Sequence, residues 1–288
     1  MDKGIGLPAT IPGTDGETVI RWAEAADRGP FSTLGIIDRL CYPNQEALMA
    51  LAAAAAVTRR VKIMPTVLVA PLREPVLLAK QVATLDVLSG GRVVLGLGVG
   101  ARPDDFVATG QDFRSRGRRL ETMLGTMRRL WRGEPVGEQA GPVGPGPVQP
   151  GGPRVFLGGF APAVLERAAR IADGIIINPG GYPYAKEMAE TVRRRWQELG
   201  RPGQPSFKAA FYYALGGPEA QERGAGYLRD YYAFLGPNVD VVVRGMLATP
   251  EAVRGVLGPL EEAGYDEVFF WPTVPDLAQV ERLTEALG

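Results

Sequence analysis

The chain has 288 residues, of which 45% are hydrophobic, and its 32 basic residues balance 32 acidic ones. With no net charge, there is no overall field that attracts nucleic acid or an anionic membrane surface, and no apolar run approaches the ~20 residues of a membrane span. The chain has no histidine and one cysteine, Cys41, which excludes a Ser-His-Asp triad, a His-ligated metal site and an intramolecular disulfide. We therefore expect no metal, no nucleic-acid or membrane partner, and a cytoplasmic protein, since residues 1–13 lack the apolar segment of a signal peptide.

Segments of strand-like composition alternate with segments of helical periodicity along almost the whole chain. The predicted strands are residues 5–7, 33–37, 61–69, 93–99, 154–157, 173–177, 207–215 and 268–271. The predicted helices are residues 17–27, 46–57, 76–88, 114–131, 163–172, 184–199, 218–235, 250–263 and 277–287. Because parallel neighbouring strands need crossover connections, this order predicts an α/β fold with a parallel sheet, and eight strands are the number in a closed (β/α)8 TIM barrel.

Residues 133–153 interrupt the alternation, because they are dense in proline and glycine and show no hydrophobic periodicity. A linker between two domains is one interpretation. A strand and a helix resume directly afterwards, however, so we favour a long loop within a single domain that spans residues 1–288.

The clearest site signal lies in residues 81–100, QVATLDVLSGGRVVLGLGVG. A helix ends at the SGGR turn, and the apolar run that follows has the composition of a strand buried on both faces. Gly96, Gly98 and Gly100 occupy every second position, so one face of this strand lacks side chains and leaves room for a flat ligand. Two alternatives remain: tight packing of the strand against its neighbours, and part of a dinucleotide fingerprint, which is less consistent with a fourth strand.

Five stretches match a known family in the right order. They are AAAAAVTRRVKIMPTVL (52–68), LAKQVATLDVLSGGRVVLGLGVG (78–100), RGRRLETMLGTMRRLWRG (116–133), VFLGGFAPAVLERAARIADGIIIN (155–178) and TPEAVRGVLGPLEEAGYDEVFFWP (249–272). On these stretches the chain resembles the bacterial luciferase-like superfamily of flavin- and deazaflavin-dependent oxidoreductases. The resemblance implies a TIM barrel with an insertion after strand four, and coenzyme F420 or FMN lying across the carboxyl ends of the strands.

The resemblance also implies which residues contact the cofactor. Family members often carry a non-prolyl cis peptide against the central ring, and Thr66–Val67 is the matching position. Gly98 and Gly100 would let the ring approach the backbone, while the turn at 158–160 precedes a helix and can aim amides at a phosphate. The predicted cofactor-binding residues are Asp38, Thr66, Val67, Gly98, Gly100, Asp104, Gly158, Gly159 and Phe160.

Two departures from the family pattern bear on the reaction. Many members have Asp-His after strand two where this chain has Asp38 and Arg39, and many have a histidine where it has Arg73 and Glu74 before a proline. Flavin monooxygenases of the family generally rely on histidine to handle protons, whereas hydride transfer with F420 needs geometry more than a base. We therefore predict F420- or flavin-dependent hydride transfer to or from a small organic substrate, with Asp38 and Arg39 as catalytic candidates. The predicted substrate-lining residues are Thr10, Tyr42, Arg73, Arg102 and Trp271.

Two other functions remain open. One is an FMN-dependent monooxygenase that uses oxygen, with Asp38 or a bound water as base and a separate flavin reductase as partner. The other is a non-catalytic accessory protein that binds flavin without turnover. The resemblance also leads us to expect a homodimer. Four tyrosines are interpreted as packing residues, with a substrate contact as the alternative: Tyr212, Tyr213, Tyr231 and Tyr232.

Overall fold

The computed structural model describes the whole chain except the side chain of Pro179. Its main sheet is entirely parallel, and its strands are β1 (Asp2–Gly6), β2 (Thr33–Ile36), β3 (Lys62–Pro65), β4 (Leu68–Val69), β5 (Leu95–Gly98), β8 (Val155–Gly158), β9 (Gly174–Ile177), β10 (Ser206–Tyr213) and β11 (Glu267–Pro272). Their order is β3-β2-β1-β11-β10-β9-β8-β5-β4. β3 and β4 follow one another along the chain as two parts of one barrel strand, and Ile63 of β3 also bridges to Val93 just before β5. The sheet is thus a nearly closed barrel, which confirms the predicted TIM-barrel fold.

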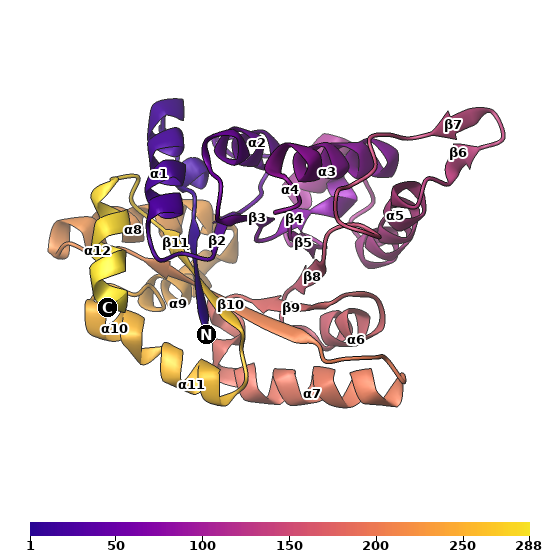
Figure 1. The fold of residues 1–288 in the computed structure, drawn as a ribbon. Coiled ribbons are helices and arrows are strands. Elements are labelled where there is room, and N and C mark those ends of the chain that lie inside the picture. The colour runs from indigo at the N-terminus through magenta and orange to yellow at the C-terminus, as the bar shows by residue number, and fades with distance from the viewer.

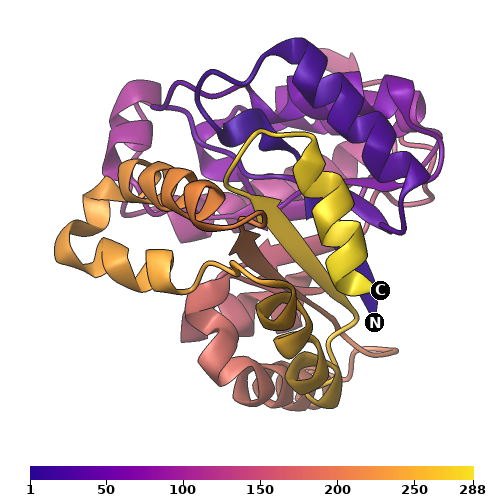
Figure 2. The same ribbon diagram turned by 90° about the vertical axis from the view of Figure 1, so that its left-hand side faces the viewer.

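Helices surround this barrel on the outside (Figures 1 and 2). The α-helices are α1 (Gly16–Arg28), α2 (Ala47–Val57), α3 (Pro75–Ser89), α4 (Pro103–Thr109), α5 (Arg116–Trp131), α6 (Pro162–Ile171), α7 (Ala185–Glu198), α8 (Pro218–Tyr231), α9 (Val239–Arg244), α10 (Pro250–Gly255), α11 (Leu257–Glu262) and α12 (Ala278–Leu287). Short 3-10 helices are η1 (Pro8–Thr10), η2 (Ala70–Leu72), η3 (Pro179–Tyr184) and η4 (Ala233–Asn238). Throughout the part of the chain that the structure describes, no helix has the length and apolarity needed to cross a membrane.

Local sequence signals account for where α3 begins and ends. The Glu74 side chain accepts a hydrogen bond from the Leu77 amide, and Pro75 occupies the first helical position, where a missing N–H costs nothing. At the other end Gly90 adopts the left-handed conformation (φ 67°) and donates to the Asp86 and Val87 carbonyls. The SGGR turn therefore ends α3 and directs the chain into β5.

The structure departs from the predicted elements in three places. Residues 133–153 are not a featureless loop, because β6 (Pro135–Gly137) and β7 (Ala140–Pro142) pair as an antiparallel hairpin that projects from the barrel (Figure 1). The single helix predicted at 250–263 is split into α10 and α11, because Pro259 has no N–H to donate to the carbonyl four residues before it. The short helices α4 and α9 were not predicted, and α4 forms the insertion after the fourth barrel strand.

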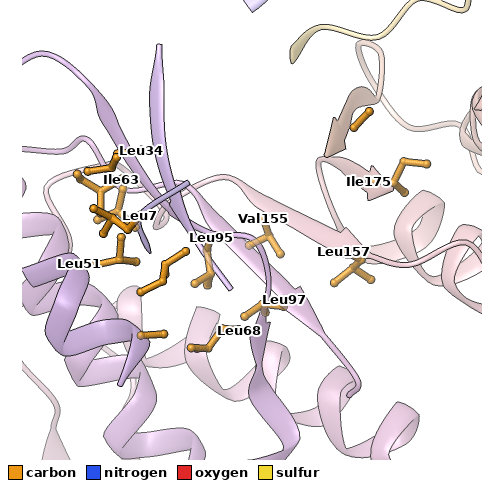
Figure 3. Packing of buried hydrophobic residues seen from close by; sticks show 14 of the residues in the cluster. Leu7, Leu34, Leu51, Ile63, Leu68, Leu95, Leu97, Val155, Leu157 and Ile175 are labelled. Carbon is orange, nitrogen blue, oxygen red and sulfur yellow. The ribbon is translucent and has the colours of Figure 1, made fainter. Parts of the chain in front are cut away.

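Two hydrophobic cores result from the alternation of side chains along the strands. The outer core lies between the strands and the helices, where Leu95 and Leu97 of β5 pack with Leu34, Ile63 and side chains of neighbouring strands (Figure 3). The inner core fills the barrel with larger residues, among them Met64, Phe156, Tyr212, Phe269 and Trp271. The bare face of β5 points into the barrel, since Leu95 and Leu97 face out.

Candidate active site

A cleft of about 440 Å³ opens at the carboxyl ends of the barrel strands, a volume in the usual range for small-ligand sites. We name it the carboxyl-end cleft. Almost every barrel strand contributes a lining residue at its end: Asp38 after β2, Thr66 and Val67 between β3 and β4, Gly98 of β5, Gly158 of β8, Asn178 after β9, Tyr212 of β10 and Trp271 of β11. Gly100, Arg102, Gly159 and Phe160 also line it. The structure thus brings together most of the predicted cofactor-binding residues.

The Thr66–Val67 peptide is cis, as the family resemblance implied. Its Val67 side chain fits between two glycines: a Cβ on Gly98 would lie 2.5 Å from Val67 Cγ2, and one on Gly158 would lie 2.6 Å from Val67 Cγ1. The glycine face of β5 is therefore not open to a ligand along its length, as we expected. At Gly96 it is closed by the Pro65 carbonyl oxygen, 2.1 Å from a built Cβ, so the packing alternative holds there.

Asp38 is 6% exposed and is held by hydrogen bonds on both carboxylate oxygens. Oδ2 accepts from the Val69 amide at 2.8 Å and from Arg73 Nη1 at 2.6 Å, and Oδ1 accepts from Arg73 Nη2 at 3.0 Å. Arg73 Nη2 also donates to Glu46 Oε1 at 2.9 Å. Burial opposes the charge on Arg73, but Asp38 and Glu46 outweigh it and raise its pKa. Arg73 therefore lies behind Asp38 as its partner and is not among the residues that line the cleft.

Four further predicted residues also lie outside the lining. Arg39 Nη1 donates to the Tyr231 carbonyl oxygen at 3.1 Å and pairs with Asp104 Oδ2 at 3.4 Å, and its guanidinium lies 4.7 Å from the Tyr42 ring centre. Tyr42 in turn donates to Asp230. Thr10 is buried in η1. Arg39, Asp104 and Tyr42 therefore form a cluster of their own beside the cleft.

Aromatic side chains and Arg102 form one part of the cleft wall. The Arg102 guanidinium lies 4.4 Å from the Tyr231 ring centre and 4.6 Å from that of Phe234, and Nη2 donates to the Tyr231 carbonyl oxygen at 3.2 Å. Trp271 Nε1 donates to Thr66 Oγ1 at 3.0 Å. The Tyr212 and Tyr232 hydroxyl oxygens lie 2.8 Å apart. The sequence analysis missed these two tyrosines as site residues; the inward register of Tyr212 on its strand was the available signal.

A second arginine lies near the start of α6. Arg116 Nη1 donates to the Phe113 carbonyl oxygen at 2.7 Å, and its guanidinium lies 3.8 Å from the Phe113 ring centre. The next residue, Gly117, lies against Arg167, whose Nη1 reaches the Ala163 carbonyl in the first turn of α6. That turn has no side-chain cap. The Gly159 amide, which we expected to face a phosphate, instead donates to the Ile176 carbonyl oxygen at 3.1 Å.

The charge in the cleft favours an anionic ligand. Among the residues that the structure describes, neither Arg102 nor Arg116 forms a salt bridge, whereas Asp38 is already paired with Arg73. The Nε atoms of Arg102 and Arg116 and Oδ1 of Asn178 are buried without a hydrogen-bond partner in the same described set. A buried polar atom without a partner is costly unless a ligand supplies one.

Residues 3–267 match the family described as luciferase-like monooxygenase. The chain belongs to the luciferase-like monooxygenase family. It is 31% identical to an uncharacterised protein of Mycobacterium tuberculosis over 217 residues, which cover 65% of this chain and 74% of that protein.

Two solved structures share the luciferase-like fold with this chain. An F420-dependent secondary alcohol dehydrogenase, in complex with an F420–acetone adduct, gives a TM-score of 0.81 at 18% identity, over 99% of this chain and 98% of the other. The oxygenating constituent of 3,6-diketocamphane monooxygenase from Pseudomonas putida, a type II Baeyer–Villiger monooxygenase in complex with FMN, gives 0.77 at 19% identity, over 99% and 96%. At these identities the likeness shows the fold alone.

The cleft of this luciferase-like protein fits a flavin or deazaflavin. Val67 and the glycines around it form a surface without polar side chains, against which a flat ring can lie. Arg102, Arg116 and the uncapped start of α6 offer positive charge to a phosphate, which FMN and F420 both carry. The unpartnered polar atoms of the wall are the donors and the acceptor that such a ligand would use.

Proposed function

We propose that the protein is an oxidoreductase in which reduced F420 or flavin, bound in the carboxyl-end cleft, exchanges a hydride with a small organic substrate. One observation carries the proposal: Asp38 is the carboxylate that lines the described part of the cleft, and both its oxygens are engaged by Arg73 and the Val69 amide. The chain has no histidine either. Hydride transfer fits such a site because it depends on the position of the two reactants more than on a free base.

Each part of the cleft has a distinct task in this proposal. Val67 and Gly98 support the ring, and Arg116 with the start of α6 holds the phosphate end. Asp38 anchors the Val69 backbone beside the ring, and Arg73 keeps that carboxylate charged and in place. The bound cofactor supplies the hydride chemistry, while the chain binds, orients and excludes water.

Separate titrations with FMN and with F420, followed by cofactor fluorescence, test the cofactor assignment. We expect binding of at least one at micromolar concentration, and we expect Arg116→Met to weaken it about tenfold because one charge-assisted bond is lost. Arg118→Met is the matched control, since Arg118 is on the same helix and does not line the cleft. If wild type binds neither cofactor, the proposal fails.

Anaerobic mixing of the reduced complex with candidate substrates distinguishes the remaining functions. Hydride transfer oxidises the cofactor without oxygen. An FMN monooxygenase consumes oxygen together with its substrate and needs a flavin reductase to supply reduced FMN. A non-catalytic accessory protein binds the cofactor tightly and does neither.

We also propose that two copies of the chain associate through α2 and α3. An apolar groove of about 320 Å³ lies between these helices, lined among others by Leu48, Met49, Leu77 and Leu88. Met49 is 59% exposed, Leu77 55% and Leu88 62%. Exposed apolar side chains that gather in one place favour a protein interface.

A further inference from the structure

Two tyrosine hydroxyls face one another in the wall of the carboxyl-end cleft. Tyr212 is on β10, Tyr232 follows α8, and their oxygens lie 2.8 Å apart. Each hydroxyl carries one proton, and their mutual bond uses one of the two. For the other proton, the described residues provide no acceptor. The pair therefore has one hydroxyl proton to donate to a ligand in the cleft.

The other polar groups of the cleft wall cannot take this role. Asp38 is a carboxylate with both oxygens occupied. Thr66 donates its hydroxyl proton to the Ile36 carbonyl oxygen at 3.1 Å and accepts from Trp271. Arginine side chains keep their protons at any ordinary pH. In a chain without histidine, the tyrosine pair is thus the proton source that the described wall offers.

Arg102 lies close enough to favour negative charge on this pair. Its guanidinium is 5.3 Å from the Tyr232 ring centre. Burial raises the pKa of Tyr232, while the hydrogen bond with Tyr212 and the charge of Arg102 oppose that rise. Tyr212 is buried against Trp271, with ring centres 5.1 Å apart, so its hydroxyl is held in one place.

We propose that the Tyr212–Tyr232 hydroxyl pair donates a hydrogen bond, and during turnover a proton, to a substrate oxygen that gains negative charge, such as the carbonyl oxygen of an aldehyde or ketone. This inference rests on the proposed hydride transfer. In the reducing direction the carbonyl carbon accepts the hydride with its electron pair, the C=O π pair moves to the oxygen, and the oxygen takes the tyrosine proton. Water then returns a proton to the phenolate. Alcohol oxidation is the reverse.

Binding of para-nitrophenol tests the pair without cofactor or substrate, because the bound phenolate is a coloured oxygen anion. At a pH below the pKa of free para-nitrophenol, we expect wild-type protein to raise the phenolate absorbance. Tyr212→Phe and Tyr232→Phe should each weaken phenolate binding about tenfold, the loss expected for one hydrogen bond to a charged oxygen. Tyr213→Phe is the matched control, since its hydroxyl is on the opposite face of β10 and donates to the Gln279 carbonyl oxygen.

Three results would overturn the inference: no binding by wild type, binding of para-nitrophenol only in its neutral form, or equal binding by wild type and the Tyr212→Phe/Tyr232→Phe double variant. Thermal unfolding of each variant confirms that it is folded, and titrations with FMN and F420 are run in parallel. If wild type binds neither cofactor while the para-nitrophenol pattern holds, the proposed function fails and the hydrogen-bond donor role of the pair stands. Where cofactor binds, the two cleft variants should lose a solvent isotope effect on hydride transfer that Tyr213→Phe retains.

Discussion

Val67 is the residue on which the shape of the cleft depends most directly. Its two methyl groups fill the spaces that Gly98 and Gly158 leave, and the cis peptide before it turns the side chain between them. The inward glycines of β5 and β8 are thus required by a neighbouring strand as much as by a ligand. A residue that packs on both strands transmits any change in them to the cleft.

Gly98→Ala should consequently weaken cofactor binding. The new Cβ would lie 2.5 Å from Val67 Cγ2, so Val67 must move toward the cleft. We expect at least a tenfold loss of affinity and about 2 kcal/mol of destabilisation from overpacking, measured by fluorescence titration and urea unfolding. Gly125→Ala is the control: nothing lies within 4 Å of its Cβ position in α5, and alanine there should stabilise the helix by about 1 kcal/mol. Equal effects of both substitutions on affinity would contradict the argument.

Arg73→Met tests the anchoring of Asp38. It leaves a buried carboxylate with the Val69 amide as its remaining partner, and such a loss costs about 3 kcal/mol of folding free energy. Arg73→Lys should recover part of that stability, because it keeps the charge but not the two-pronged geometry. Arg129→Met, which removes an exposed pair with Glu134, should change the urea midpoint little. If Arg73→Met unfolds like wild type, Asp38 has another partner.

At the scale of elements, β10 and β11 are linked by a buried ion pair at their amino-terminal ends. Lys208 and Glu267 are register partners in the two strands, and Ser32 donates a hydrogen bond to the same carboxylate. Burial opposes the charge of Glu267, but the Lys208 ammonium and these hydrogen bonds outweigh it and hold its pKa below the ordinary value of 4.5. The pair therefore joins strands far from the cleft, where it serves the barrel and not the reaction.

The depressed pKa sets the sign of the pH dependence. Because Glu267 is protonated more easily in the unfolded chain, its contribution to stability is present above pH 4.5 and is lost as the pH falls through its lower folded value. Glu267→Gln should cost about 3 kcal/mol near neutral pH, since Lys208 keeps its charge without a counter-charge. The difference from wild type should shrink in acid. Urea unfolding at several pH values measures both effects, and a pH-independent difference would contradict the assignment.

The sequence predicted the elements better than their contacts. Buried parallel strands appear as apolar runs, so the eight barrel strands could be recognised, and the family resemblance identified the Thr66–Val67 peptide. The β6–β7 hairpin could not be predicted, because its strands are short and exposed and carry no hydrophobic pattern. Likewise, Arg39 follows a barrel strand as a site residue would, yet Asp104 and the Tyr231 carbonyl hold it beside the cleft.

At the scale of the molecule, the position of the charged and apolar side chains separates the working end of the barrel from its outer surface. The cleft concentrates positive charge although the chain as a whole is neutral. The partly apolar α2–α3 surface lies on the outside of the barrel, away from that charge, and the two chain termini lie close together elsewhere (Figure 2). A second copy bound at α2 and α3 would therefore leave the cleft open to its ligands.

Leu77→Glu tests this association. A glutamate at the apolar α2–α3 groove has to be desolvated when a second copy packs against it, which costs several kcal/mol and exceeds what one contact contributes. We expect wild type to migrate as a dimer and Leu77→Glu as a monomer in size-exclusion chromatography with light scattering. Val107→Glu is the control, because Val107 is 81% exposed on α4 and outside the groove. The variant monomer should still bind cofactor, since every residue that we assign to the cleft belongs to one chain; a wild-type monomer, or a dimer that survives Leu77→Glu, would place the interface elsewhere.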